Sequence, residues 1–394
     1  MKKILNCAAA VIAAAAILGV QSCTSDPAAP ENPGSNETPE TPGTEPSATI
    51  EVSDIDLWSN TAKVSVSAEN IDDLKVYYGV KDSGVSHEIE AEEGVYTISA
   101  GYKTSQNDAG LNVSSLVEGT GVFAGRTYVV EVFDGEPSES NLPVASKEFT
   151  QEGGDEIPNG DMSGWSTKGE KALPYPNAEG ESFWDSGNND MAAAFNSYLC
   201  QEDPDQEGVA FLSANMVLGS VFAPGNMYTG DFKMDGMMGT ANFGKVFKWT
   251  ARPTALKVTY KAKVGIVDKV GIYDKEGSEY KGKQDNSRIF AAVVDWSKQH
   301  GVTSGMGEPS GMWDPVKKTE LEEGAILGYA SLMIDESSDG FVTVEIPFMW
   351  YDTVSAPADG NYSIVISCAT SNRGDYLTGC STNELRIDSM EFVY

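Results

Sequence analysis

The residues best suited to chemistry in this sequence are tryptophans that stand beside carboxylate, amide and guanidinium groups. The stretch FWDSGNND places Trp184 next to Asp185 and Asn188. An aromatic ring can stack on the apolar face of a sugar, while planar polar groups exchange hydrogen bonds with its hydroxyls. The same residues could instead form a capped loop whose tryptophan fills the edge of a core. The candidate sugar-binding residues are Trp184, Asp185, Asn188, Tyr228, Trp249, Arg252, Trp313, Arg373, Asp375 and Tyr376.

Each candidate has a structural alternative. Trp313 is the best exposed candidate, because it lies in a 27-residue connection from Ser297 to Glu323 and has little core to join. Connections of that length inside a compact domain are usually functional or mobile. Trp249 and Arg252 could simply close a sheet edge, with the guanidinium stacked on the indole. Tyr376 could equally plug the core.

Hydrolysis of a glycosidic bond is the one catalytic chemistry that the sequence leaves open. The two histidines, His87 and His300, lie far apart in the chain, and no Gly-x-Ser-x-Gly or His-Glu-x-x-His motif occurs, which argues against a histidine-assisted nucleophile or a zinc hydrolase. Glycoside hydrolysis needs only two carboxylates at a suitable separation. Asp185 and Asp375 form the candidate catalytic pair, although we expect binding rather than catalysis.

A structural calcium ion is the one cofactor to consider. Asp161, in the turn NGDMS, and Asp388, in the late IDS, are the candidate ligands. Calcium takes six or more oxygen ligands, so a hydrogen-bonded turn is favoured over a metal site. The cysteines of the folded part form no CxxC motif and read as buried small hydrophobes, with one Cys368–Cys380 bridge left open. They are Cys200, Cys368 and Cys380.

The N-terminus predicts export and lipidation. Two lysines precede the apolar run ILNCAAAVIAAAAILGV, and QSC follows it, so residues 1–22 read as a signal peptide. The site resembles a bacterial lipobox, with Gln21 as a departure from its preferred small residue, and Cys23 would then carry lipid. Residues 23–47, rich in Pro, Glu and Thr, predict a disordered tether. We expect an outer-membrane lipoprotein on the surface or periplasmic face.

The charge of the chain limits its partners. A formal net charge of −32 over 394 residues gives a field that repels nucleic acid and anionic membrane surfaces. Membrane attachment is therefore expected through the lipid alone. Remaining partners are a polysaccharide or oligosaccharide, and another envelope protein.

The elements that must position these residues are β-strands. Residues 48–152 alternate apolar and polar side chains in short runs separated by turn residues, which predicts an immunoglobulin or fibronectin III-like sandwich. A polar, glycine-bearing joint follows. Residues 157–394 continue with strands and longer connections, which predicts a larger β jelly roll. The expected fold class is therefore all-β.

The second half is similar to a known family. The Phe-Gly-x-x-Phe…Arg-Pro-x-x-Leu-Lys run at Phe243–Lys257 and the run at Gly374–Gly379 carry the most specific part of the likeness. Together with FWDSGNND and ELRIDSMEFVY they resemble the PCMD family, named for carbohydrate metabolism, of Bacteroidetes lipoproteins. The resemblance covers 157–394. It implies a jelly roll like those of carbohydrate-binding modules, preceded by an immunoglobulin-like domain.

Three functions follow as hypotheses. The first is a cell-envelope lipoprotein that binds carbohydrate and takes part in glycan capture or metabolism. The second is a glycoside hydrolase that uses a carboxylate pair on the same fold. The third is a structural or adhesion subunit that binds another envelope protein.

Overall fold

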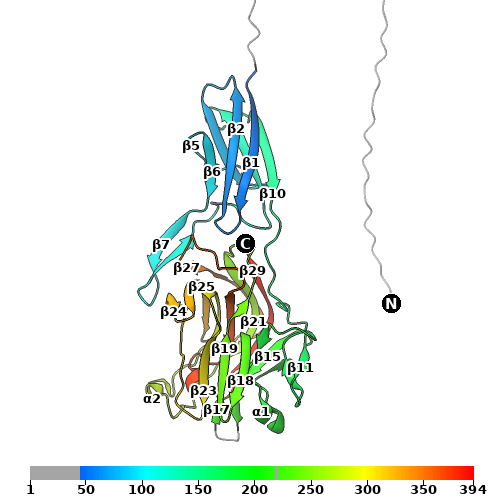
Figure 1. Cartoon of the computed structure of the whole chain (residues 1–394), viewed down its shortest axis with the longest axis vertical. Helices are drawn as coiled ribbons and strands as arrows, with labels where there is room; N and C mark the ends of the chain where they lie inside the picture. Colours follow the sequence, from blue (N-terminus) through cyan, green and yellow to red (C-terminus); the bar gives the residue numbers. More distant parts are fainter. Residues whose placement is uncertain (1–44, 218–220) are drawn as a thin grey trace, which may run out of the picture. The chain divides into compact units, whose positions relative to one another are not determined.

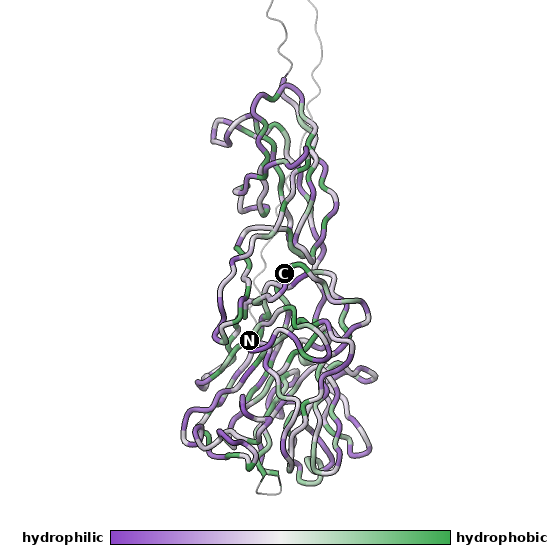
Figure 2. Tube along the Cα trace, turned by 60° about the vertical axis from the view of Figure 1, so that its left-hand side comes forward, coloured by the Kyte–Doolittle hydropathy of each residue, from purple (hydrophilic) through white to green (hydrophobic). Residues whose placement is uncertain are grey.

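The computed structural model describes residues 45–217 and 221–394 as an almost entirely β protein (Figure 1). The predicted signal peptide, Cys23 and nearly all of the predicted tether lie outside the described residues. Within the described ranges, no helix has the length and apolar character needed to cross a membrane. Figure 2 shows hydrophobic and hydrophilic segments interspersed along the described part of the chain.

The first part is a sandwich of two four-stranded sheets whose core includes Val64, Val76 and Val130. The strand orders, β1-β2-β6-β5 and β10-β9-β3-β4, follow the immunoglobulin-type arrangement. The predicted sandwich is confirmed, while its relation to the immunoglobulin or fibronectin III families stays a prediction. Its strands are β1 (Ser47–Asp56), β2 (Thr61–Glu69), β3 (Leu74–Val80), β4 (His87–Glu88), β5 (Ala91–Glu92), β6 (Val95–Ser99), β9 (Thr127–Asp134) and β10 (Ala145–Thr150).

The second part contains two packed sheets, which confirms the predicted sandwich of jelly-roll type. The small sheet has the order β14-β15-β29-β21-β26, and every pairing in it is antiparallel. Alternate residues such as Leu256, Val258 and Leu385 bury one face of it in the main core. Its strands are β14 (Cys200–Glu202), β15 (Ala210–Ser213), β21 (Ala255–Lys263), β26 (Val342–Pro347) and β29 (Glu384–Val393).

The large sheet has the order β23-β19-β18-β28-β22-β25-β27, with β13, β20 and β24 paired beside this path. Ile289 and Ile366 point to the small sheet and into the main core. The strands are β13 (Trp184–Asp185), β18 (Asn226–Asp235), β19 (Met238–Phe243), β20 (Lys245–Val246), β22 (Ser287–Trp296), β23 (His300–Gly305), β24 (Glu320–Leu321), β25 (Gly324–Ile334), β27 (Met349–Trp350) and β28 (Tyr362–Ala369).

The large sheet also covers apolar side chains on its other face. Tyr228, Val294, Trp296 and Val365 form a separate buried cluster there. Strand β22 accordingly reads as the nearly continuous apolar run IFAAVV, which is expected where both faces of a strand are covered. This second face carries the candidate site described below.

Short elements connect and cover the sheets. They are the hairpins of β11 (Ser166–Lys168) with β12 (Leu173–Tyr175) and of β16 (Asn215–Val217) with β17 (Val221–Ala223), the helices α1 (Asp190–Phe195) and α2 (Gly277–Tyr280), and the 3-10 helix η1 (Gly374–Tyr376).

A hairpin from the first half extends the large sheet of the second. Strands β7 (Tyr102–Gln106) and β8 (Asn112–Leu116) pair with each other, and Ser114 of β8 pairs with Trp350 of β27. Asn107, in the turn of this hairpin, donates to the carbonyl oxygen of Val316 over 2.8 Å. The two halves therefore share hydrogen-bonded structure.

Candidate functional site

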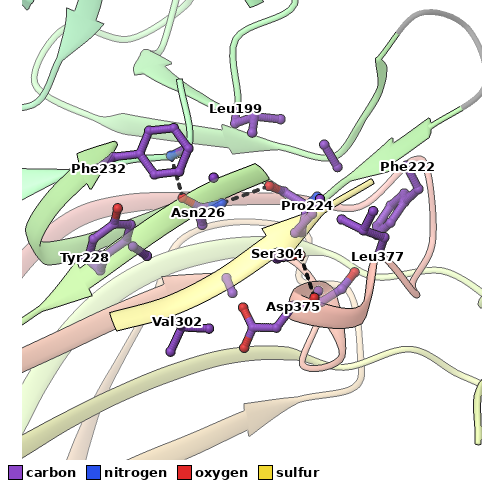
Figure 3. A pocket seen from close by; sticks show the side chains of 18 of the residues that line it. Leu199, Phe222, Pro224, Asn226, Tyr228, Phe232, Val302, Ser304, Asp375 and Leu377 are labelled. Carbon is purple, nitrogen blue, oxygen red and sulfur yellow. Dashed lines mark hydrogen bonds between the residues drawn. The ribbon is translucent and has the colours of Figure 1, made fainter. Parts of the chain in front are cut away.

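The candidate site is a pocket on the face of the large sheet that points away from the main core. Alternate residues of neighbouring strands line its floor, and the pairings of Tyr228 with Ser367 and of Ser367 with Phe290 place three of them side by side. Its cavity volume is about 270 Å³, close to the lower limit of roughly 300 Å³ for pockets that hold small ligands. Figure 3 shows this floor together with the segments that cover it.

Asp375 is the one carboxylate among the described residues that line the pocket. It lies in η1, whose backbone is fixed to the sheet because the hydroxyl of Ser304 donates to the carbonyl oxygen of Asp375 over 2.6 Å. Figure 3 shows its side chain projecting from η1 beside the strand that carries Val302 and Ser304. None of the hydrogen bonds among the described residues involves its carboxylate. This carboxylate is therefore free to accept hydrogen bonds from a ligand.

The electrostatics of the pocket favour a proton on Asp375 at mildly acidic pH. Protein atoms crowd the carboxylate and raise its pKa to about 6, while the positive charge of Arg288 acts in the opposite direction. Water reaches the residue from the open side of the pocket, which limits the shift. Asp375 is thus ionised at neutral pH and becomes protonated near pH 6.

Arg373 and Tyr376, both candidates from the sequence, hold η1 in place and do not line the pocket. The guanidinium of Arg373 lies 4.2 Å from the ring centre of Tyr280 and 5.1 Å from that of Tyr376. It also forms an ion pair with Asp274. These contacts fix the turn that presents Asp375, so we interpret both residues as positioning groups.

Arg288 forms one wall of the pocket and fixes the segment that carries Trp313. Its guanidinium donates to Asp314 over 2.7 Å and lies 5.1 Å from the ring centre of Phe290. Partial burial alone would raise the pKa of Asp314, but the hydrogen bond and charge of Arg288 outweigh it and lower the pKa. The ion pair therefore stays formed at neutral pH.

Trp313 lines the pocket, as expected for a residue that contacts ligand. The expectation that it has little core to pack against is wrong. Its indole packs against Phe290, Trp296 and His300, with ring centres 5.6, 5.2 and 6.1 Å away. The connection from Ser297 to Glu323 is also partly ordered into β23 and β24. Trp313 is half-buried, so it supplies both packing and a pocket wall.

Tyr228 lies in the floor of the pocket. Its side chain is only 2% exposed, and its ring centre is 4.8 Å from that of Phe243. Among the described residues no group bonds to its hydroxyl. Burial raises the pKa of this phenol well above its ordinary value. The hydroxyl is therefore a neutral polar group without a protein partner.

For the candidates Trp184 and Asn188, the structure shows the alternative of a capped loop whose tryptophan fills the core. Trp184 is 0% exposed in the main core, and its Nε1 donates to the carbonyl oxygen of Pro158 over 2.8 Å. Asn188 is also buried, where its amide bonds to the backbone of Pro174, Leu199 and Cys200. Neither side chain lines the pocket, but the same FWDSGNND stretch reaches it through Gly187 and the half-buried Asn189.

The proposed catalytic pair is not assembled. Asp185 is 3% exposed and does not line the pocket that contains Asp375. Burial raises its pKa, and an ion pair with Lys168 and a 2.7 Å hydrogen bond from the backbone N–H of Phe232 oppose the shift. Asp185 thus fixes the position of β18, and the two carboxylates do not flank one open site.

Trp249 and Arg252 follow their structural alternative, although Arg252 stacks on other indoles than that of Trp249 and both residues contact the first half of the chain. Arg252 is 1% exposed and stacks between the indoles of Trp58 and Trp350, at 4.9 and 4.6 Å. Its Nε donates to the carbonyl oxygen of Trp58 over 2.7 Å. Trp249 packs on Trp58 with ring centres 6.1 Å apart. We call this cluster, Trp58, Trp249, Arg252 and Trp350, the seam.

The candidate calcium ligands have local partners. Asp161 accepts hydrogen bonds from the backbone and hydroxyl of Ser163, at 3.2 and 2.9 Å. Within the described ranges, no group of three or more His, Cys, Asp or Glu residues gathers as a metal site would. Asp388 interacts with the neighbouring Ser389. The hydrogen-bonded turn thus accounts for Asp161 without a metal.

The described cysteines are buried and free, so the Cys368–Cys380 bridge is not formed in the structure. Burial raises the pKa of the Cys200 and Cys368 thiols. These two thiols therefore remain protonated and unreactive at neutral pH.

Sequence reasoning missed the apolar lining of the pocket and Arg288. The signal that could have found the lining is the alternation in β18, where Tyr228, Phe232 and Met234 fall on one face with Asn226. Both faces of this strand carry apolar residues, so the sequence does not indicate which face borders a pocket. The other missed lining residues include Met191, Phe222, Met237, Phe290, Met306 and Leu377.

The chain has recognisable likenesses among solved structures. Among solved structures, the chain is similar to a "putative glycoside hydrolase" from Bacteroides vulgatus ATCC 8482, with 18% identity, a TM-score of 0.43, and coverage of 59% of this chain and 96% of that one. It is also similar to a "putative glycoside hydrolase" from Bacteroides thetaiotaomicron VPI-5482, with 14% identity, a TM-score of 0.36, and coverage of 83% and 98%. No curated protein matches the sequence.

The family comparison agrees with the resemblance carried by the sequence motifs. A family model described as "Putative carbohydrate metabolism domain", PCMD, matches residues 159–393, which contain every strand of the small sheet and the whole pocket. The chain therefore belongs to the PCMD family.

Proposed function

We propose that this protein is a cell-envelope lipoprotein that binds carbohydrate in the pocket on the outer face of the large sheet. The observation that carries the proposal is the pocket itself, which is lined both by the Asp375 carboxylate, without a protein partner among the described residues, and by the indole of Trp313. A carboxylate can accept hydrogen bonds from sugar hydroxyls, and an indole face can stack on a sugar ring. Membership of a carbohydrate-metabolism family supports the same role.

We favour binding over hydrolysis because the described lining of the pocket contains one carboxylate, Asp375. Glycosidases of the common type use two carboxyl groups on either side of the scissile bond. In the described lining of the pocket Asp375 stands alone, and Asp185 is held in an internal ion pair. We therefore assign Asp375 a binding role.

The envelope location rests on the N-terminal sequence. The basic start, the apolar run and Cys23 support export with lipid attachment, and two or more acyl chains would hold the protein firmly at a membrane. Metabolic labelling with a palmitate analogue tests this part. Label on wild type that is lost in Cys23→Ala supports the anchor, and an unlabelled wild type contradicts it.

The binding test should use the soluble chain from residue 24 to 394. The second half alone would lose the pairing of β8 with β27 and would expose Arg252, which the seam buries. A folding failure of that fragment would then imitate a loss of function. The longer chain keeps both contacts.

Glycan arrays and polysaccharide affinity gels on this chain, with Asp375→Asn beside wild type, test the proposal. We expect wild type to bind at least one glycan and the variant to bind it about tenfold less tightly, since a hydrogen bond to a charged acceptor contributes roughly 1.5–3 kcal/mol. Asp359→Asn, an exposed carboxylate in a turn outside the pocket, is the matched control. A folded wild type that binds no glycan would contradict the proposal, and a co-purifying envelope protein would then favour the adhesion hypothesis.

A further inference from the structure

Most polar side chains that line the pocket already hydrogen-bond to other groups of the protein. The amide of Asn226 accepts from the backbone N–H of Gly187 over 2.8 Å and donates to the carbonyl oxygen of Pro224 over 3.1 Å. Ser304 bonds to the backbone of Asp375, and Arg288 bonds to Asp314. Few hydrogen-bonding groups besides the Asp375 carboxylate are left for a ligand.

One end of the pocket is strongly apolar. Met234 lies near the end of β18, Met237 lies in the turn that follows it, and Met306 follows β23. These segments touch, because the backbone N–H of Met306 donates to the carbonyl oxygen of Met237 over 3.2 Å. Met237 and Met306 are 53% and 45% exposed. The three residues, which we call the methionine end, form an apolar surface that water reaches.

Gly239 leaves room for two apolar side chains near the methionine end. Gly239 lies opposite Met234 in the hairpin of β18 and β19. A Cβ atom at Gly239 would lie 2.6 Å from the ring of Phe232 and 3.2 Å from the sulfur of Met234. A side chain at Gly239 would therefore displace Phe232 or Met234 from its place in the pocket lining.

An unsubstituted sugar does not match such a surface. It carries hydroxyls on most carbons, and a hydroxyl that leaves water without a new partner costs about 1–3 kcal/mol. Methionine side chains are flexible and polarisable, and they make favourable contacts with aromatic rings. The methionine end therefore suits an apolar group, and the nearby Asp375, whose backbone is tied to Ser304 two residues before Met306, suits hydroxyls.

We propose that the natural ligand is a carbohydrate with an apolar substituent, whose sugar hydroxyls bind Asp375 and whose substituent lies on the methionine end. This inference rests on the proposed carbohydrate-binding function and names the ligand class within it. The pocket would thus select substituted sugars over plain ones.

The experiment compares methyl and 4-nitrophenyl glycosides of the same sugars, with 4-nitrophenol alone, by calorimetric titration of residues 24–394. We expect at least one nitrophenyl glycoside to bind about tenfold tighter than its methyl partner, a difference of about 1.4 kcal/mol, and nitrophenol alone to bind far more weakly. Equal affinity within every binding pair would overturn this inference and leave carbohydrate binding intact. Nitrophenol binding as tightly as its glycosides, or no binding by any compound, would overturn both proposals.

Two variants locate the preference. Replacing Met237 and Met306 together by glutamine changes apolar side chains to polar ones of similar length at exposed positions. We expect this double variant to lose the preference for the nitrophenyl glycoside while its affinity for the methyl glycoside changes less than twofold. Met333→Gln is the control, because Met333 is also 45% exposed and lies outside the pocket lining. A preference that survives in the double variant contradicts the assignment.

Discussion

The seam and the wall of the pocket each combine an arginine with aromatic rings, and they serve different ends. In the seam, Arg252 is stacked between Trp58 and Trp350 and bonds to backbone carbonyl oxygens. In the pocket, Arg288 lies beside Phe290 and pairs with the carboxylate of Asp314. Arg252 and its two stacking partners in the first cluster are buried, whereas the second cluster borders a cavity that water reaches.

The difference shows that residue type alone does not mark a binding site. Arg252 is buried, and burial lowers its pKa, so its contacts to both halves of the chain stabilise their association. Arg288 uses its charge to hold the neighbour of Trp313 and leaves Asp375 without a fixed partner. A binding site here needs an unpaired polar group facing open space, and only the second cluster borders one.

Replacing Arg252 by alanine should produce the largest change in stability. We expect the free energy of unfolding to fall by about 3 kcal/mol, because the change leaves a cavity between two indoles and removes hydrogen bonds of a charged group. Chemical denaturation of residues 24–394 measures it. A fall in the free energy of unfolding of less than about 0.5 kcal/mol would show that Arg252 does not stabilise the association of the two halves.

Asp185→Asn tests whether Asp185 has a structural role, as the seam residues have, or a role in ligand binding. We expect a loss of about 2 kcal/mol, since the ion pair with Lys168 and the hydrogen bond from Phe232 are weakened in a buried place, and little change in glycan affinity. Thermal unfolding and titration of one sample give both values. A folded variant that has lost binding would return Asp185 to the site.

The pH dependence of ligand affinity tests whether the ionised Asp375 carboxylate binds the ligand. Its folded pKa of about 6 lies above the ordinary value of 3.8, so the folded state binds more protons than the unfolded state between about pH 4 and 6. Its contribution to stability therefore declines as pH rises through that window. Ligand affinity should run the other way and weaken as pH falls from 7 to 5, because the protonated acid is a poorer acceptor. A wild-type profile as flat as that of Asp375→Asn would refute this role.

Tyr228→Phe should have the smallest effect. It removes a buried hydroxyl that has no partner in the described protein, and an unsatisfied buried group costs about 1–3 kcal/mol. We expect the free energy of unfolding to rise by about 1 kcal/mol, as measured by denaturation. A clear fall in stability would mean that the hydroxyl has a partner and that the pocket floor is closed.

The fold was more predictable than the site. Period-two alternation and turn residues identify the strands, and family-like motifs identify the second domain. Trp184 was misread because its burial depends on pairing with Thr229 and on the backbone of Pro158, contacts that a local pattern does not contain. An indole beside amides looks the same in the sequence whether the loop turns inward or outward.

The seam and the apolar pocket were harder to predict from the sequence for a related reason. Ser114 and Trp350 pair across a long stretch of chain, and nothing near either residue signals the other. No sequence pattern singled out the methionines of the pocket, because Met237 and Met306 come from segments that meet only in the fold. Asp375 and Trp313 were recognised because their residue types suit sugars, not because the sequence placed them together.

A crystal structure of residues 24–394 with the glycan selected on the array tests the central claim most directly. We expect ligand in the pocket on the outer face of the large sheet, with sugar hydroxyls within about 3 Å of the Asp375 carboxylate and the seam unchanged. Ligand bound at the seam, on the small sheet or elsewhere, with the pocket unoccupied by it, would contradict the account.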